Sequence, residues 1–211
     1  MTSKLTYLFD PLCGWCYGAS PALQQLAQHH TIHLELAPTG LFSGAGGRVM
    51  DAGFAAYAWS NDTRIQKLTG QRFTEAYRAQ VLGKSGVRFD SAAVTLALTA
   101  VSLTEPQREL SALKLLQEAR YVQGQDTSEL STVTDILHEH GLAPAAERLL
   151  AGESQLKVAN NTRLQQAQQL MQTLGVRGVP ALVLIQGGKM RLLRSELLFG
   201  KIDTLLAAIT A

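Results

Sequence analysis

The residues whose types and spacing could do chemistry are two cysteines, Cys13 and Cys16, which are the only ones among 211 residues. They enclose Gly14 and Trp15. A strand-like run at 5–9 leads into the pair, and an apolar pattern of helical period leads away from it. A helix that begins at Cys13 has free backbone N–H groups that favour an anion, so Cys13 is the expected nucleophile. Cys16, one turn further on, can close a disulfide and release a bound substrate.

A structural metal site is the first alternative for a pair of cysteines at this spacing. Structural zinc needs four ligands, usually from two cysteine pairs or from one pair with histidines. The chain has no second cysteine pair, and among its five histidines only His29 and His33 have a suitable spacing, across an expected helix-to-strand junction. We therefore expect no metal and favour redox chemistry over zinc binding or two inert core thiols.

Composition limits the remaining function classes. Hydrophobic residues make up 46% of the chain and charged residues 17%, which is typical of a globular core. The formal charge of +2 gives no argument for nucleic acid or an anionic membrane as a partner. The sequence has no long apolar span and no secretory signal pattern, so we expect a cytoplasmic protein without a membrane segment.

The first part of the chain predicts a β-α-β unit. Strands are expected at 4–9 and 32–37, and a helix at 13–29 that Pro21 should kink. A helix of this length between two strands makes them parallel neighbours. Asp10, before the cysteines, is expected to be a turn residue, with proton transfer as a less favoured alternative.

The middle of the chain predicts helices and no convincing strand. The glycine-rich segment 39–50 lacks the ending of a phosphate-binding loop, so we interpret it as a flexible connection. Beyond it, apolar residues recur at helical period as far as Leu174, and Gly175 fits a helix end. Asp126 and Glu129 resemble a capping box before another helix.

The end of the chain returns to strands. A continuous apolar run at 181–185 predicts a strand buried on both faces, and Gly187 and Gly188 predict a hairpin turn into a partner strand at 190–193. A closing helix follows around 202–209. Val179-Pro180 comes just before the third strand, where proline can begin a strand. An ordinary trans proline is the simpler interpretation of these two residues alone, and the isomer stays open.

These motifs resemble the thioredoxin superfamily: Cys-x-x-Cys at the start of the first helix, Pro21 five residues after Cys16, and Val-Pro before a β-hairpin. A long helical block between the two halves is similar to the DsbA family. The run Phe9-Asp10-Pro11-Leu12-Cys13-Gly14-Trp15-Cys16 is similar to its FrnE-like and predicted protein-disulfide-isomerase branch.

The resemblance implies an α/β, thioredoxin-like fold with a large all-helical insertion. Residues 1–38 and 176–211 would form the thioredoxin-like domain, and residues 39–175 the inserted helical domain. It implies catalysis by Cys13 and Cys16 and a cis Pro180 beside their disulfide. Val179 would offer its backbone to an extended substrate, with Gly14 and Trp15 completing the substrate-binding set.

The implied activity is that of a protein disulfide oxidoreductase or isomerase, working through a mixed disulfide with cysteine-containing proteins. We expect no cofactor beyond the redox-active disulfide, a monomer, and exchange with glutathione as a further option. Gly14-Trp15 stands where the best-known DsbA members carry Pro-His. The motif therefore lacks a positive charge, and we expect a weaker oxidant. The alternative is a glutathione-dependent enzyme similar to kappa-class transferases or 2-hydroxychromene-2-carboxylate isomerases, which typically have serine at the first cysteine position.

Overall fold

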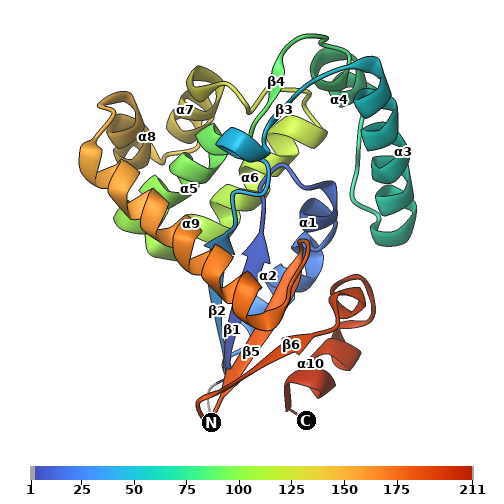
Figure 1. The fold of residues 1–211 in the computed structure, drawn as a ribbon, viewed down its shortest axis with the longest axis vertical. Coiled ribbons are helices and arrows are strands. Elements are labelled where there is room, and N and C mark those ends of the chain that lie inside the picture. Colours follow the sequence, from blue (N-terminus) through green and yellow to red (C-terminus); the bar gives the residue numbers. More distant parts are fainter. Residues whose placement is uncertain (1–2, 211) are drawn as a thin grey trace.

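The computed structural model describes residues 3–210; Met1, Thr2 and Ala211, which belong to the predicted thioredoxin-like domain, lie outside the described residues. Four strands form a mixed sheet in the order β2-β1-β5-β6 (Figure 1). Strand β1 pairs parallel with β2 and antiparallel with β5, and β6 pairs antiparallel with β5. The strands are β1 Ser3–Phe9, β2 Ile32–Pro38, β5 Ala181–Gln186 and β6 Lys189–Leu193. The predicted strands, the parallel pairing of β1 with β2 and the hairpin of β5 and β6 are thus confirmed.

Helices separate β1 from β2 and β2 from β5, and one follows β6. The insertion between β2 and β5 carries most of them, and its helical character is confirmed. The helices are α1 Gly14–Gly18, α2 Ser20–Gln28, α3 Ala52–Thr69, α4 Glu75–Tyr77, α5 Ala92–Thr104, α6 Glu109–Tyr121, α7 Leu130–Glu139, α8 Ala143–Leu150, α9 Ser154–Leu174 and α10 Ile202–Thr210.

The single kinked helix predicted for 13–29 is two helices in the structure. The break lies at Ala19, which keeps right-handed helical dihedral angles (φ −79°, ψ −11°). Pro21 has no N–H group to donate to the carbonyl of Tyr17, so the hydrogen-bond ladder is interrupted there. Cys13 is the N-terminal cap of α1, as the sequence predicts.

The insertion also holds a small two-stranded sheet that the sequence did not indicate. Strands β3, Arg48–Val49, and β4, Arg88–Phe89, pair antiparallel. Two-residue strands are too short to show an alternating pattern. The predicted capping box was also wrong, because α7 is capped at Glu129 without a side-chain bond. Asp126 instead accepts a hydrogen bond from the amide of Ser128.

The two faces of the sheet are covered by different parts of the chain. Leu8 and Val183 pack on one face against Ala167 of α9, while Tyr7 and Leu184 belong to the larger core that includes α10. Figure 1 shows α9 crossing the sheet although it belongs to the inserted segment. The division into a thioredoxin-like and a helical domain stays a prediction, and the two parts share packing across the sheet.

Asp10 connects the cysteine loop to the insertion. Its side chain is fully buried and accepts hydrogen bonds from the amides of Leu12 and Phe42, both at 2.9 Å, and from the Ser91 hydroxyl at 2.8 Å. Burial raises the pKa of this carboxyl, while the three hydrogen bonds oppose the rise. The glycine-rich segment that begins the insertion is thereby held against the loop before Cys13, and is not the flexible connection that we predicted.

Replacing Asp10 with alanine should lower the free energy of unfolding by about 3–5 kcal/mol, because buried donors then lose their acceptor. Asp10→Asn, which keeps one acceptor oxygen, should lose about half as much. Chemical denaturation of both variants measures the difference. Exposed Asp135→Asn on α7 is the control and should change little. Equal stability of Asp10→Ala and the wild type would contradict this role.

Candidate active site

The two cysteines differ in their access to solvent. Both are free thiols at the start of α1. Cys13 keeps 7% of its surface exposed, and Cys16 is fully buried. Burial raises the pKa of the Cys16 thiol well above its ordinary value, and a hydrogen bond and charge interaction with Cys13 act in the same direction. Cys16 therefore holds its proton while Cys13 is the thiol that a substrate can reach.

Val179 and Pro180 lie beside Cys13. The peptide bond between them is cis, as the family resemblance implied. The Cys13 thiol donates a long hydrogen bond to the carbonyl of Val179, with 3.7 Å between Sγ and O. Pro180 is buried and Val179 is partly exposed. The structure thus brings together two segments that are 166 positions apart in the sequence.

Helix α6 supports the loop that carries the cysteines. The Tyr121 hydroxyl donates a 2.8 Å hydrogen bond to the carbonyl of Leu12, and the Gln117 side chain donates a 3.5 Å bond to the carbonyl of Pro11. Tyr121 also stacks on Tyr17 of α1, with ring centroids 4.9 Å apart. The insertion therefore holds the backbone immediately before Cys13.

Helix α3 packs closely against α1 because α1 has glycine at two positions four residues apart. A Cβ atom on Gly14 would overlap Oδ1 of Asp62 and lie 3.2 Å from Ile65 Cδ1. A Cβ atom on Gly18 would lie 2.7 Å from Ile65 Cγ2. Glycine at position 14 therefore leaves the space that a carboxyl group of the insertion occupies.

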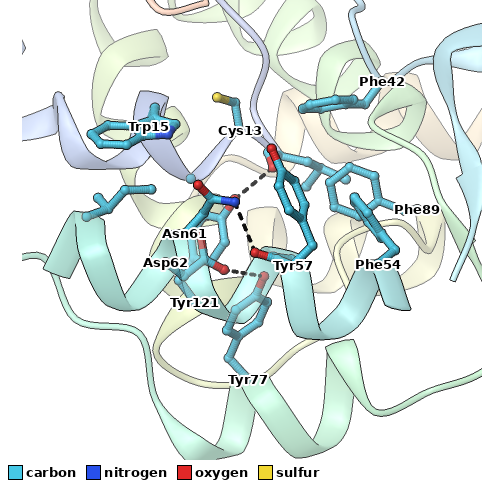
Figure 2. A pocket seen from close by; sticks show the side chains of 14 residues that line it. Cys13, Trp15, Phe42, Phe54, Tyr57, Asn61, Asp62, Tyr77, Phe89 and Tyr121 are labelled. Carbon is cyan, nitrogen blue, oxygen red and sulfur yellow. Dashed lines mark hydrogen bonds between the residues drawn. The ribbon is translucent and has the colours of Figure 1, made fainter. Parts of the chain in front are cut away.

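A pocket of about 150 Å³ lies between the cysteine motif and the insertion. Figure 2 shows Cys13 and Trp15 on one side, with Tyr57, Asn61 and Asp62 of α3 beneath them in that view. Most of the lining is apolar or aromatic. The other lining residues are Leu12, Gly14, Phe42, Phe54, Ala58, Ile65, Tyr77, Phe89 and Tyr121.

Asp62 is the acidic residue of this pocket. Only 5% of its surface is exposed, and its Oδ2 accepts a 3.0 Å hydrogen bond from the Tyr77 hydroxyl. Burial raises the pKa of the carboxyl to about 7, although the Tyr77 hydrogen bond and the Arg120 charge lower it. A buried carboxyl that titrates near neutral pH beside a reactive thiol is the kind of group found at functional sites.

A positive charge also lies beside the motif. The Arg64 guanidinium of α3 stands over the Trp15 ring, 5.6 Å from its centroid, and Phe199 contacts the same ring edge-on at 5.3 Å. The sequence motif contains no cation, but the fold brings one from 49 residues further along the chain. Trp15 is thus held between the insertion and the C-terminal part.

The structure brings all six predicted site residues to one place: Cys13, Gly14, Trp15, Cys16, Val179 and Pro180. Gly14 faces Asp62 and Ile65 of α3 at the position where a Cβ atom would lie. Trp15 is partly buried and lines the pocket. Sequence reasoning missed Asp62 and Arg64. The one available signal was an acidic residue at the buried helical spacing of Ala58 and Ile65, which a single sequence cannot distinguish from an ordinary surface position.

The fold and the paired thiols beside a cis-proline define a thioredoxin-fold dithiol–disulfide oxidoreductase. Residues 4–208 match the family model of the DSBA-like thioredoxin domain, and the chain belongs to that family. No match was found among curated proteins.

Solved structures agree with this assignment. The cytosolic disulfide reductase DsbM from Pseudomonas aeruginosa is 30% identical, with a TM-score of 0.86 over 98% of this chain and 97% of that chain. The same protein with glutathione (GSH) is 29% identical and gives 0.84 over the same shares. A candidate protein disulfide isomerase from Nitrosomonas europaea, 22% identical with a TM-score of 0.78 over 99% of both chains, shows the same fold.

In residues 3–210 we find no group of three or more metal-ligating side chains. None of the described helices is long and apolar enough to cross a membrane.

Replacing Gly14 with alanine should destabilise the fold by about 1–3 kcal/mol, because the new methyl group overlaps the Asp62 carboxyl. The cost should be smaller in an Asp62→Ala background, where that overlap is removed, and a double-mutant cycle measured by denaturation reports the difference. Gly178→Ala is the control, since its Cβ would meet no atom within 4 Å. Additive costs for Gly14→Ala and Asp62→Ala would show that the two side chains do not meet.

The raised pKa of Asp62 predicts how stability depends on pH. Between its ordinary value of 3.8 and the folded value of about 7, the unfolded chain has lost the proton that the folded chain keeps. The free energy of unfolding should therefore fall as the pH rises through this interval, by about 3–5 kcal/mol in total. Asp62→Asn should lack that part of the dependence. Parallel curves for the wild type and this variant, measured by denaturation across the interval, would contradict the assignment.

Proposed function

We propose that this protein reduces disulfides of cysteine-containing proteins in the cytoplasm and is itself reduced again by glutathione. The observation that carries the proposal is the asymmetry of the thiols beside the cis-proline. Cys13 is accessible next to Val179, while Cys16 is buried and keeps its proton. The likeness to a protein described as a cytosolic disulfide reductase, and to the same protein with glutathione, supports the direction, the compartment and the reductant.

The reaction proceeds through a mixed disulfide. The Cys13 thiolate attacks one substrate sulfur, a bond forms between them, and the other substrate sulfur leaves as a thiolate that takes a proton from water. Cys16 then gives up its proton and attacks Cys13 Sγ, which releases the second substrate thiol. The substrate gains two electrons and the protein becomes the Cys13–Cys16 disulfide. Two glutathione thiols return the electrons and leave as glutathione disulfide.

The substrate backbone is expected at Val179. This residue is partly exposed and precedes the buried Pro180, so an extended polypeptide can pair with its backbone as an added strand. Trp15 and the aromatic wall of the pocket offer apolar surface beside the reacting sulfur. The site needs no metal and no cofactor other than the cysteine pair, and we propose that the protein works as a monomer.

Cys16→Ser should accumulate covalent complexes with cellular proteins, because no other cysteine can release a substrate from Cys13. The complexes are detected by non-reducing electrophoresis and should disappear on addition of dithiothreitol. Cys13→Ser is the matched control and should accumulate none. If Cys16→Ser carries glutathione alone and keeps its activity on small molecules, the glutathione-dependent alternative is supported and protein reduction fails.

Isomerase activity is the second candidate, supported by the structural likeness to a candidate protein disulfide isomerase. Recovery of activity from ribonuclease with scrambled disulfides separates the two directions. A reductase should lower the disulfide content of that substrate when glutathione is supplied, while an isomerase should restore native pairing at constant disulfide content.

A further inference from the structure

The resolving thiol must carry a negative charge in a place that water does not reach. Cys16 is fully buried. Its sulfur is charged twice in the proposed cycle, when it attacks the mixed disulfide at Cys13 and when it leaves as the oxidised pair is reduced. A buried anion is costly unless hydrogen-bond donors replace its water. Donors for the Cys16 thiolate must therefore come from the protein itself.

The hydroxyl group of Tyr7 lies beside Cys16. Tyr7 is on β1, and none of its surface is exposed. Its hydroxyl donates a hydrogen bond to the backbone carbonyl of Cys16, with 3.3 Å between the two oxygens. Because O–H···O hydrogen bonds are usually about 2.7–2.8 Å long, this carbonyl alone is a poor acceptor for a buried hydroxyl. The hydroxyl can turn its hydrogen toward a second acceptor.

The Cys16 sulfur is that second acceptor. Burial raises the pKa of Tyr7 well above its ordinary value, and the charges of Cys16 and Cys13 and a hydrogen bond to the Cys16 side chain raise it further. Tyr7 therefore keeps its proton near neutral pH and acts toward the sulfur as a donor. The bond becomes stronger when the sulfur is ionised, because hydrogen bonds to charged acceptors are about twice as strong as neutral ones.

The other groups around the Cys16 sulfur leave this role to Tyr7. Burial and the neighbouring Cys13 are the main causes that raise the pKa of the Cys16 thiol, and the charge of the Asp10 carboxyl adds to them. That carboxyl accepts hydrogen bonds from three other donors. The backbone N–H of Asp10 opposes the rise through a hydrogen bond to the sulfur. Tyr7 thus supplies the side-chain donor and Asp10 a backbone donor.

We propose that Tyr7 is a catalytic residue whose hydroxyl donates a hydrogen bond to the Cys16 thiolate, with the backbone N–H of Asp10 as the second donor. The inference rests on the dithiol exchange of the proposed function and holds for either direction of that exchange. Of the two thiols, the one that the hydroxyl bonds to is Cys16. It should therefore assist the steps in which Cys16 reacts and leave the attack of Cys13 on a substrate unchanged.

The hydrogen bond would act when the mixed disulfide is resolved. The Cys16 sulfur bonds to Cys13 Sγ, the bond between Cys13 and the substrate sulfur breaks, and the substrate leaves as a thiol with the proton that Cys16 has lost. This step completes the oxidation of the cysteine pair. In the return half, an external thiol bonds to Cys13 Sγ, the disulfide breaks, and Cys16 takes up the proton that this thiol has lost. Tyr7 keeps its own proton in both steps.

A structural role for the same hydroxyl makes a different prediction. The bond to the Cys16 carbonyl would then only hold α1 against β1, and its loss would disturb both thiols at the start of α1 together. A donor to the Cys16 thiolate affects one thiol and spares the other. The two roles are therefore separated by measuring the reactions of Cys13 and Cys16 in the same experiment.

The test resolves the two thiols in time. Reduced protein is mixed in a stopped-flow instrument with excess dithiobis(nitrobenzoate), an aromatic disulfide that releases a coloured thiolate. Attack by Cys13 releases the first equivalent at a rate that rises with the reagent concentration. Attack by the buried Cys16 on the resulting mixed disulfide releases the second equivalent at a rate independent of that concentration.

Tyr7→Phe should slow the release of the second equivalent about tenfold, which corresponds to about 1.4 kcal/mol, and leave the first unchanged. Phenylalanine keeps the ring that stacks on Phe9, with centroids 5.5 Å apart, so the core stays filled. The oxidised form of the same variant should react with dithiothreitol about tenfold more slowly than the wild type, because Cys16 is the leaving group of that reaction. Tryptophan fluorescence follows this second measurement.

Tyr17→Phe is the matched control. It also removes the hydroxyl of a buried tyrosine, next to Cys16 in the sequence, but this hydroxyl interacts with Glu118 and Arg72. Both phases should be unchanged in this variant. Cys16→Ser identifies the second phase, because it should release a single equivalent.

Two results for Tyr7→Phe would overturn the inference. The variant reacts like the wild type in both phases, or both phases are slowed by the same factor, as a structural role requires. Either result leaves the proposed function standing, since the wild type still releases two equivalents. A wild-type protein that releases only one equivalent refutes the exchange between Cys13 and Cys16, and with it both the inference and the proposed function.

Discussion

The close approach of α3 to α1 is the constraint on which the site depends. Gly14 and Gly18 present no side chain toward α3, and Ile65 and Asp62 occupy the space that Cβ atoms would take. This contact forms one wall of the pocket and places a carboxyl group against the residue between the two cysteines. A side chain at position 14 would overlap the Asp62 carboxyl and crowd Ile65.

Burial gives chemically identical groups different roles. Cys13 and Cys16 are both thiols, but only Cys16 is wholly removed from solvent, which disfavours its charged form. The two buried aspartates differ instead in the hydrogen-bond donors around them. Asp10 is surrounded by three donors and joins two parts of the chain, whereas Asp62 has one donor, and its other oxygen lies against Gly14.

The insertion completes the active site of the thioredoxin-like part. Asp10 binds it at the glycine-rich segment, and Tyr121 supports the backbone at Leu12. Asp62 and Arg64 both come from α3, so the charges around the cysteine pair are supplied by the insertion and not by the motif.

The sequence by itself determined the cysteine pair, the strands of the main sheet, the parallel pairing of β1 with β2, the hairpin of β5 and β6, and the helical insertion, because each depends on local spacing or period. It determined the pairing of Cys13 with Val179 only through the family resemblance. The tertiary structure decided the antiparallel pairing of β1 with β5, the short strands β3 and β4, and the places of Asp62 and Arg64. The physical reason is that burial and charge at one point depend on helices distant in the sequence, which no local pattern records.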